Sequence, residues 1–151
     1  MTVAVFNHTG QVVTDLERAT TFYEQALGFS RWFEINPPDD ATAQLCSLQG
    51  PLGVSARYLT LGDFTLELIH YAEPNVTADY RARTMNEPGL THLSIAVDDV
   101  RSCARRVVEY GGSAIEQSNI GVGMLVRDPE GQLIELLDRD FRDTLPPRPG
   151  G

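Results

Sequence analysis

The sequence contains no lysine, and all 12 of its basic residues are arginine. Schiff-base catalysis through a lysine amine is therefore excluded, and with it one large class of carbonyl enzymes. The acidic residues number 21, which gives a net charge of −9. This balance disfavours nucleic acids and anionic membranes as partners.

Cysteine is also scarce, and long apolar runs are missing. The two cysteines, Cys46 and Cys103, do not form a CxxC motif, so we expect free thiols rather than metal ligands or nucleophiles. No apolar segment typical of a secretion signal or a membrane span is present. We therefore expect a cytoplasmic protein that has no membrane partner.

A repeated pattern is present in this otherwise ordinary composition. The segments FNHTGQVVTDL and LTHLSIAVDDV each place a histidine, His8 or His92, early in an apolar strand that runs into a helix start. Each histidine is followed by a glutamate within a later apolar strand, Glu67 or Glu135. Two imidazoles and two carboxylates are a plausible complete ligand set for one divalent metal.

The repeat predicts one domain made of two modules, since 151 residues is the length of a single ordinary domain. Each module shows a strand, an amphipathic helix and three further strands. In the first module we expect a helix start at Thr14 or Asp15, a helix end at Gly28 and a hairpin turn at Gly62 and Asp63. The expected boundaries are module one at 3–72, with a loop at 37–53, a linker at 73–89, module two at 90–138 and a flexible tail at 139–151.

Strand parity indicates which side chains share a face, because successive residues of a strand point to opposite sides of the sheet. Glu67 lies between Leu66 and Leu68, so it faces away from their apolar side. Glu135 is placed in the same way between two apolar residues. His70 shares the face of Leu66 and Leu68, and we therefore expect it to have a structural role.

Four segments resemble the vicinal oxygen chelate superfamily of glyoxalases, bleomycin resistance proteins and extradiol dioxygenases: HTGQVVTDLERATTFYEQALGF, LELI, GLTHLSIAVDDV and DPEGQLIELLD. The resemblance implies an α+β fold in which two βαβββ modules form a cupped, partly open mixed β-barrel with the helices outside. It also implies that His8, Glu67, His92 and Glu135 bind one divalent ion, which is Mn, Ni, Co, Zn or Fe. A homodimer is a further expectation from the resemblance, with the site closed within one chain or across two.

Four protein ligands leave an octahedral ion two positions for substrate oxygens, whereas extradiol oxygenases use a triad of ligands. This favours a metal-dependent epimerase or isomerase that moves a proton at a carbon adjacent to a carbonyl. The resemblance, which is to epimerases of the superfamily in particular, implies a small-molecule substrate that is an α-hydroxy ketone, such as a cyclitol or sugar-like ketone, or an acyl-CoA ester. The alternatives are a glyoxalase I-like lyase, an extradiol-type dioxygenase and a metal-free ligand-binding or resistance protein.

Two kinds of side chain are expected to act on the substrate. Glu135 and Glu67 are candidates for proton transfer, since a ligand carboxylate that leaves the metal is free to act as a base. Tyr58, Thr60 and Met124 are candidates for the substrate-binding wall.

Overall fold

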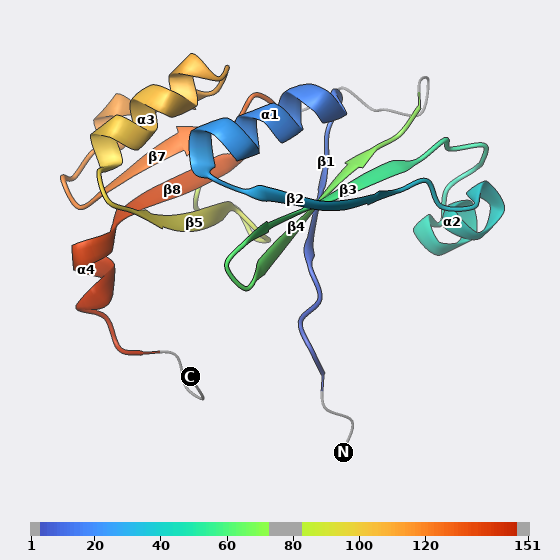
Figure 1. The fold of residues 1–151 in the computed structure, drawn as a ribbon, viewed down its shortest axis with the longest axis horizontal. Helices are drawn as coiled ribbons and strands as arrows, with labels where there is room; N and C mark the ends of the chain where they lie inside the picture. Colours follow the sequence, from blue (N-terminus) through green and yellow to red (C-terminus); the bar gives the residue numbers. More distant parts are fainter. Residues whose placement is uncertain (1–3, 73–82, 148–151) are drawn as a thin grey trace. The chain divides into compact units, whose positions relative to one another are not determined.

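A computed structural model describes residues 4–72 and 83–147 of the chain (Figure 1). The chain divides into two compact units: unit 1 is Met1–Glu24 with Gly28–Asp79, and unit 2 is Gln25–Leu27 with Tyr80–Gly151. Each unit contains a four-stranded sheet of mixed direction, and the predicted α+β fold of paired βαβββ modules is confirmed.

The first module has the predicted strand, helix, strand, strand, strand order, with one additional short helix. Its elements are β1 (Thr9–Val12), α1 (Leu16–Leu27), β2 (Ser30–Ile35), α2 (Asp39–Cys46), β3 (Ser55–Leu61) and β4 (Phe64–His70). The strand order in the sheet is β1-β4-β3-β2, with β1 parallel to β4 and the other pairs antiparallel. This order makes β1 and β3 the two neighbours of β4, the strand that carries Glu67.

Helix α1 begins and ends at residues suited to those positions. The side chain of Asp15 accepts a hydrogen bond from the Arg18 amide at 2.9 Å, which satisfies a free donor of the first turn. Gly28 ends the helix with φ at 78°, a left-handed conformation that glycine adopts without strain. The predicted hairpin turn at Gly62 and Asp63 is likewise present between β3 and β4.

The second module repeats this arrangement. Its elements are β5 (His92–Val97), α3 (Val100–Glu109), β6 (Ser113–Ala114), a single 3₁₀ turn η1 (Glu116–Ser118), β7 (Gly123–Arg127), β8 (Leu133–Asp138) and α4 (Arg139–Asp143). The strand order is β5-β8-β7-β6, again with the first strand parallel to the last. Asp99 caps α3 as Asp15 caps α1, by accepting a hydrogen bond from the Ser102 amide at 2.8 Å.

Two short helices differ from the sequence expectations. Helix α2 forms within the segment expected to be a loop, where Asp39 accepts hydrogen bonds from the Leu52 and Gly53 amides at 2.7 and 2.8 Å. Helix α4 forms at the start of the segment expected to be a flexible tail, and Asp138 caps it. Most of the expected linker at 73–89 lies outside the described residues. None of the described helices is long and apolar enough to cross a membrane.

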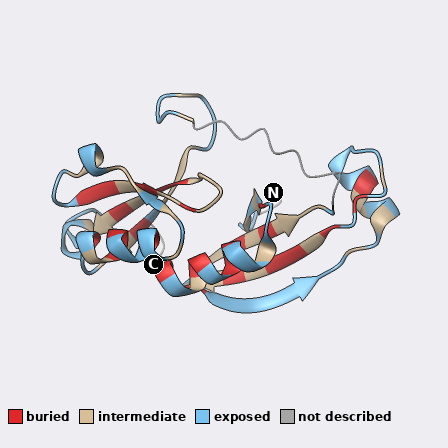
Figure 2. Cartoon of the chain, turned by 90° about the horizontal axis from the view of Figure 1, so that it is seen from above, coloured by how far each residue is buried: buried red, intermediate tan, exposed pale blue. Residues whose placement is uncertain are grey.

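Each sheet has one face covered by a helix and one face that carries a glutamate. In unit 1 the helix side holds the fully buried Leu59, Leu66 and Leu68, and in unit 2 it holds Ile134 and Leu136. Figure 2 shows buried positions that alternate with less buried ones along strands of both units. Glu67 and Glu135 alternate with these leucines and isoleucines along their strands. Strand parity therefore separates the carboxylates from the apolar core, as the sequence predicts.

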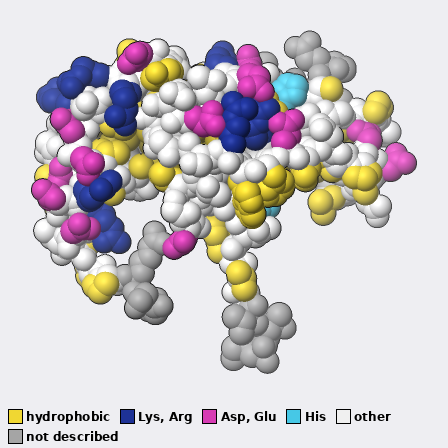
Figure 3. Space-filling model, viewed as in Figure 1, with side chains coloured by type: hydrophobic (Ala, Val, Ile, Leu, Met, Phe, Trp, Pro, Cys, Tyr) yellow, Lys and Arg dark blue, Asp and Glu magenta, His cyan; other side chains and the backbone are white. Residues whose placement is uncertain are grey.

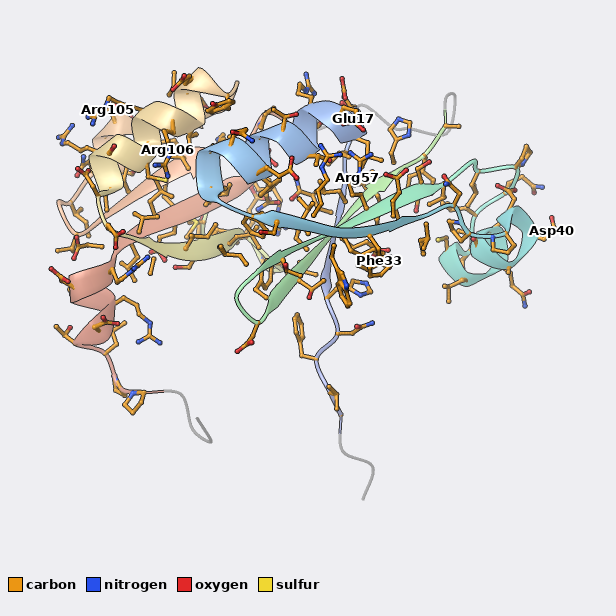
Figure 4. The ribbon with its side chains drawn as sticks, viewed as in Figure 1. Glu17, Phe33, Asp40, Arg57, Arg105 and Arg106 are labelled. Carbon is orange, nitrogen blue, oxygen red and sulfur yellow. The ribbon has the colours of Figure 1, made fainter. Side chains whose placement is uncertain are left out.

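The helix side of the unit 1 sheet also holds a buried arginine, Arg57, which is only 8% exposed. Its guanidinium donates to Glu17 of α1 and Glu34 of β2, each at 2.6 Å, and to the Thr20 hydroxyl at 2.8 Å (Figure 4). This network joins α1 to the sheet. Arg57 pairs with Leu68, so both side chains lie on the helix side of the sheet, and Glu67 points to the opposite side.

Candidate functional site

The first histidine and glutamate of the repeat meet in unit 1. His8 immediately precedes β1, and its Nε2 lies 2.9 Å from Oε2 of Glu67. Gly10, two residues further along, pairs with Glu67 across the parallel strands. A Cβ atom at Gly10 would lie 3.5 Å from the same carboxylate oxygen and 3.3 Å from Ile69 Cδ1. The missing side chain therefore leaves the space beside the carboxylate open.

Tyr58 holds the other oxygen of the Glu67 carboxylate. It pairs with Glu67 across β3 and β4, and its hydroxyl donates to Oε1 at 2.6 Å. Burial raises the pKa of the Tyr58 phenol to about 12, and the hydrogen bond to Glu67 and its charge act in the same direction. The phenol therefore stays protonated near neutral pH and acts as a donor. Both oxygens of Glu67 are engaged, and its side chain is only 14% exposed.

The second histidine and glutamate form a looser pair in unit 2. Nε2 of His92 lies 4.0 Å from Oε2 of Glu135, and the Glu135 side chain is 36% exposed. The Ser94 hydroxyl donates a short hydrogen bond to the same carboxylate oxygen. The Thr91 hydroxyl lies 2.8 Å from Nδ1 of His92, which leaves Nε2 directed at the carboxylate.

The chemistry of these groups fits half of a metal site in each unit. Imidazole nitrogens and carboxylate oxygens suit several first-row divalent ions. A ligand histidine usually donates its other ring N–H to an oxygen atom, and Nδ1 of His92 would donate in this way to the Thr91 hydroxyl if Nε2 bound a metal. In unit 1 the buried Nδ1 of His8 has no hydrogen-bond partner in the described part of the chain. Residues 4–72 and 83–147 contain these groups as pairs, and no three His, Cys, Asp or Glu side chains converge there.

The three expected substrate-binding residues lie in different places. Tyr58 and Thr60 are on the face of Glu67, and Tyr58 is already committed to the carboxylate. Met124 pairs with Leu136 and is 3% exposed, so it lies on the helix side of its sheet, away from Glu135. There it lines a cavity of about 310 Å³ beside α3.

The other sequence expectations concern His70 and the cysteines. His70 pairs with Ser55 and shares the parity of Leu66 and Leu68, so β4 directs it away from the face of Glu67. Both cysteines are free, and burial raises the pKa of the Cys103 thiol, which disfavours its thiolate form.

A sequence profile of the Glyoxalase/Bleomycin resistance protein/Dioxygenase superfamily matches residues 5–136. The chain belongs to this superfamily. The match includes both histidine and glutamate pairs and both βαβββ modules.

Solved structures of this superfamily show the same fold. A glyoxalase family protein from Bacillus cereus is 21% identical over 91% of this chain and 95% of its own, with a TM-score of 0.78. The trypanothione-dependent glyoxalase I of Leishmania major is 22% identical over 91% and 88%, with a TM-score of 0.68. The fosfomycin resistance protein FosX of Listeria monocytogenes is 13% identical over 97% and 100%, with a TM-score of 0.59. At these identities the likeness concerns the fold, and the reaction must be argued from the site.

Proposed function

We propose that this superfamily member is a metal-dependent isomerase or epimerase that moves a proton at a carbon adjacent to a carbonyl. The observation that carries the proposal is the occurrence of one histidine and one glutamate at matched register positions in each unit. A carboxylate on a strand face without a cationic partner is costly when it is partly buried, and a bound cation would remove that cost.

In this proposal His8, Glu67, His92 and Glu135 bind one divalent ion, which is Mn, Ni, Co, Zn or Fe. The two pairs come from one chain or from two chains of a homodimer. A cation bound by these groups would polarise the substrate carbonyl and acidify the adjacent C–H bond.

The two carboxylates then have different tasks. Tyr58 holds one oxygen of Glu67 and the other oxygen lies beside His8, so Glu67 is a stationary ligand. Glu135 is held by one serine hydroxyl and is more exposed, so it is freer to rotate away and take up the substrate proton. We therefore assign Glu135 as the proton acceptor.

The test is solvent deuterium uptake at the α-carbon of candidate α-hydroxy ketones and acyl-CoA esters. We expect uptake that depends on metal, in protein purified without chelators and analysed for metal content. Protein that holds no stoichiometric metal, and takes up none of the five ions when they are supplied, would contradict the proposal.

The same assay separates the alternative functions. Consumption of O₂ with ring opening would identify a dioxygenase, and turnover that requires a thiol adduct would identify a glyoxalase I-like lyase. Tight retention of an unchanged ligand without metal would identify a binding or resistance protein.

A further inference from the structure

Three aromatic side chains form a continuous row in unit 1 that ends at the Glu67 pair. The rings of Trp32 and Phe33 meet edge to face, with centroids 4.7 Å apart. Phe33 stacks on Tyr58 at 4.3 Å with an interplanar angle of 13°, and Tyr58 meets the His8 ring edge to face at 5.5 Å. We call Trp32, Phe33 and Tyr58 the aromatic row.

A β-bulge in β2 creates this row. Arg31 pairs with Leu59 while Phe33 pairs with the next residue, Tyr58, so Trp32 is an extra residue in the strand. Without the bulge Arg31 and Phe33 would share a face, because they are two residues apart. With it, Arg31 reaches Glu24 of α1 at 2.8 Å, whereas Phe33 lies on the opposite side of the sheet. Figure 4 shows Phe33 on the side of β2 and β3 away from Glu17 and Arg57.

Two rings of the aromatic row are exposed to solvent. Trp32 is 65% exposed and Phe33 is 39% exposed, and Val12 and Ile35 are also exposed on the same sheet. Figure 3 shows hydrophobic side chains gathered near β2, below a group of charged ones. Exposed apolar patches of this kind mark binding surfaces.

The size of this surface favours a small ligand over a protein. A stable protein interface uses about 20–30 residues on each side, whereas the aromatic row with Val12 and Ile35 offers five side chains. A row of aromatic rings next to two polar groups is instead typical of a small-molecule pocket wall. The contact of Tyr58 with Glu67 at 2.6 Å makes the row continuous with the proposed reaction site.

We infer that the aromatic row binds a flat apolar ring of the substrate, so the compound is an α-hydroxy ketone or related carbonyl compound with an aromatic substituent. This inference rests on the proposed function, since the His8 and Glu67 pair is what makes the row part of a reaction site. The ring stacks on Phe33 and packs against Trp32, while the carbonyl end lies toward Tyr58 and Glu67. Offset stacking of rings adds attraction beyond the burial of apolar area.

Binding to metal-free protein tests the inference independently of catalysis. The probes are α-hydroxyacetophenone and hydroxyacetone, which share the hydroxy ketone and differ in the ring. Trp32 is the single tryptophan of the chain, so its indole N–H gives one resolved NMR signal at the end of the row. We expect α-hydroxyacetophenone to bind at least about tenfold more tightly, with a ring-current shift of that signal.

Phe33→Leu is the variant that removes the ring and keeps apolar bulk. We expect it to reduce the ratio of the two affinities to less than about threefold, since stacking is lost and the rest of the face remains. Phe141→Leu is the matched control, because Phe141 is exposed to the same 39% but lies in α4 of unit 2. It should leave the ratio unchanged.

Several results would overturn the inference. These are equal affinities for the two probes, an unshifted indole signal at saturation, and equal effects of Phe33→Leu and Phe141→Leu. A fourth is a wild-type dimer that dissociates on Phe33→Leu in analytical ultracentrifugation, because the row would then pack against a second copy. If the ring preference holds but no metal binds and no deuterium is taken up, the inference stands and the proposed function fails. If deuterium uptake occurs with no ring preference, the reverse is true.

Discussion

Glu67 and Glu135 occupy the same register position in the two units, yet each is held from a different side. The cross-strand neighbours of Glu67 are Gly10 on β1 and Tyr58 on β3. Those of Glu135 are Ser94 on β5 and Leu125 on β7. In unit 1 the hydroxyl group that binds the glutamate comes from Tyr58 on the third strand of the module. In unit 2 it comes from Ser94 on the first strand of the module.

This difference between the units gives the two carboxylates different freedom. The pKa of the Tyr58 phenol is raised to about 12, so the phenol stays protonated and its hydrogen bond orients the Glu67 carboxylate. The other oxygen of Glu67 lies 2.9 Å from His8. The Ser94 hydroxyl is small, and Glu135 stays more exposed and 4.0 Å from its histidine. The two modules thus share one histidine and glutamate pattern, while the neighbouring side chains hold the Glu67 carboxylate more firmly than the Glu135 carboxylate.

Replacing each glutamate by glutamine should give the largest difference between the two units. For Glu135→Gln we expect deuterium uptake to fall by about 10²–10⁴-fold, the usual contribution of a general base, with metal still bound. For Glu67→Gln we expect the larger loss of metal, because a neutral amide is a weaker ligand and Glu67, unlike Glu135, is proposed to stay on the ion. Metal analysis and exchange rates on both proteins measure this. A Glu135→Gln protein with bound metal and full exchange would show that Glu135 is not the base.

Replacing the two histidines of unit 1, His8 and His70, should affect metal affinity differently, because they lie on opposite faces of the sheet. For His8→Ala we expect metal affinity to fall on the order of 100-fold. Losing a ligand should cost at least as much as losing a group that only orients a ligand, which typically costs about 10–100-fold. His70→Ala is the matched control, since His70 follows the parity of Leu66 and Leu68. Calorimetric titration with each divalent ion measures both. Equal losses in the two variants would contradict the assignment of His8 as a ligand.

Much of this arrangement follows from sequence patterns with a clear physical origin. The caps at Asp15 and Gly28 and the alternation around Glu67 reflect local rules, and the structure has them all. The partner of Glu67 was also within reach of such rules, because a two-residue turn at Gly62 and Asp63 sets Tyr58 opposite Glu67.

Other features depend on contacts that no local pattern reveals. Met124 was expected on the substrate wall, but the register of β7 against β8 sets it beside Leu136, and that register depends on a longer connection. The bulge at Trp32 has no glycine to mark it, and it is visible only from the pairing of β2 with β3. Helix α2 forms in a segment rich in turn residues, and Asp39 at its start accepts hydrogen bonds from the distant amides of Leu52 and Gly53.

Removing the hydroxyl group that binds each glutamate should have smaller effects on metal affinity, and these should differ between the two units. For Tyr58→Phe we expect metal affinity to fall about 10–100-fold, because Glu67 loses the group that orients it. For Ser94→Ala we expect a smaller loss, since solvent can replace the serine at the more exposed Glu135. The same titrations measure both variants. If Ser94→Ala had the larger effect, the assignment of Glu67 as the stationary ligand would be reversed.

The smallest expected effect concerns acid stability, and it separates the helix sides of the two sheets. Arg57 in unit 1 and Met124 in unit 2 occupy equivalent positions, opposite Leu68 and Leu136. The hydrogen bond from Arg57 lowers the pKa of Glu17 below its ordinary value of 4.5. A carboxyl with a lowered pKa in the folded state stabilises the protein above the unfolded pKa, and that stabilisation is lost as the pH falls through the folded pKa.

We therefore expect the melting temperature of the wild type to exceed that of Glu17→Gln at neutral pH, and the difference to disappear as the pH falls below 4.5. Because the Glu17 side chain is 68% exposed, solvent screens the pair and the difference should be no more than about 4 °C. Thermal unfolding at several pH values measures it. Glu116→Gln is a suitable control, since Glu116 is exposed in unit 2 and has no ion pair within the described residues. A difference that grew on acidification would mean that Arg57 does not stabilise the charged form of Glu17.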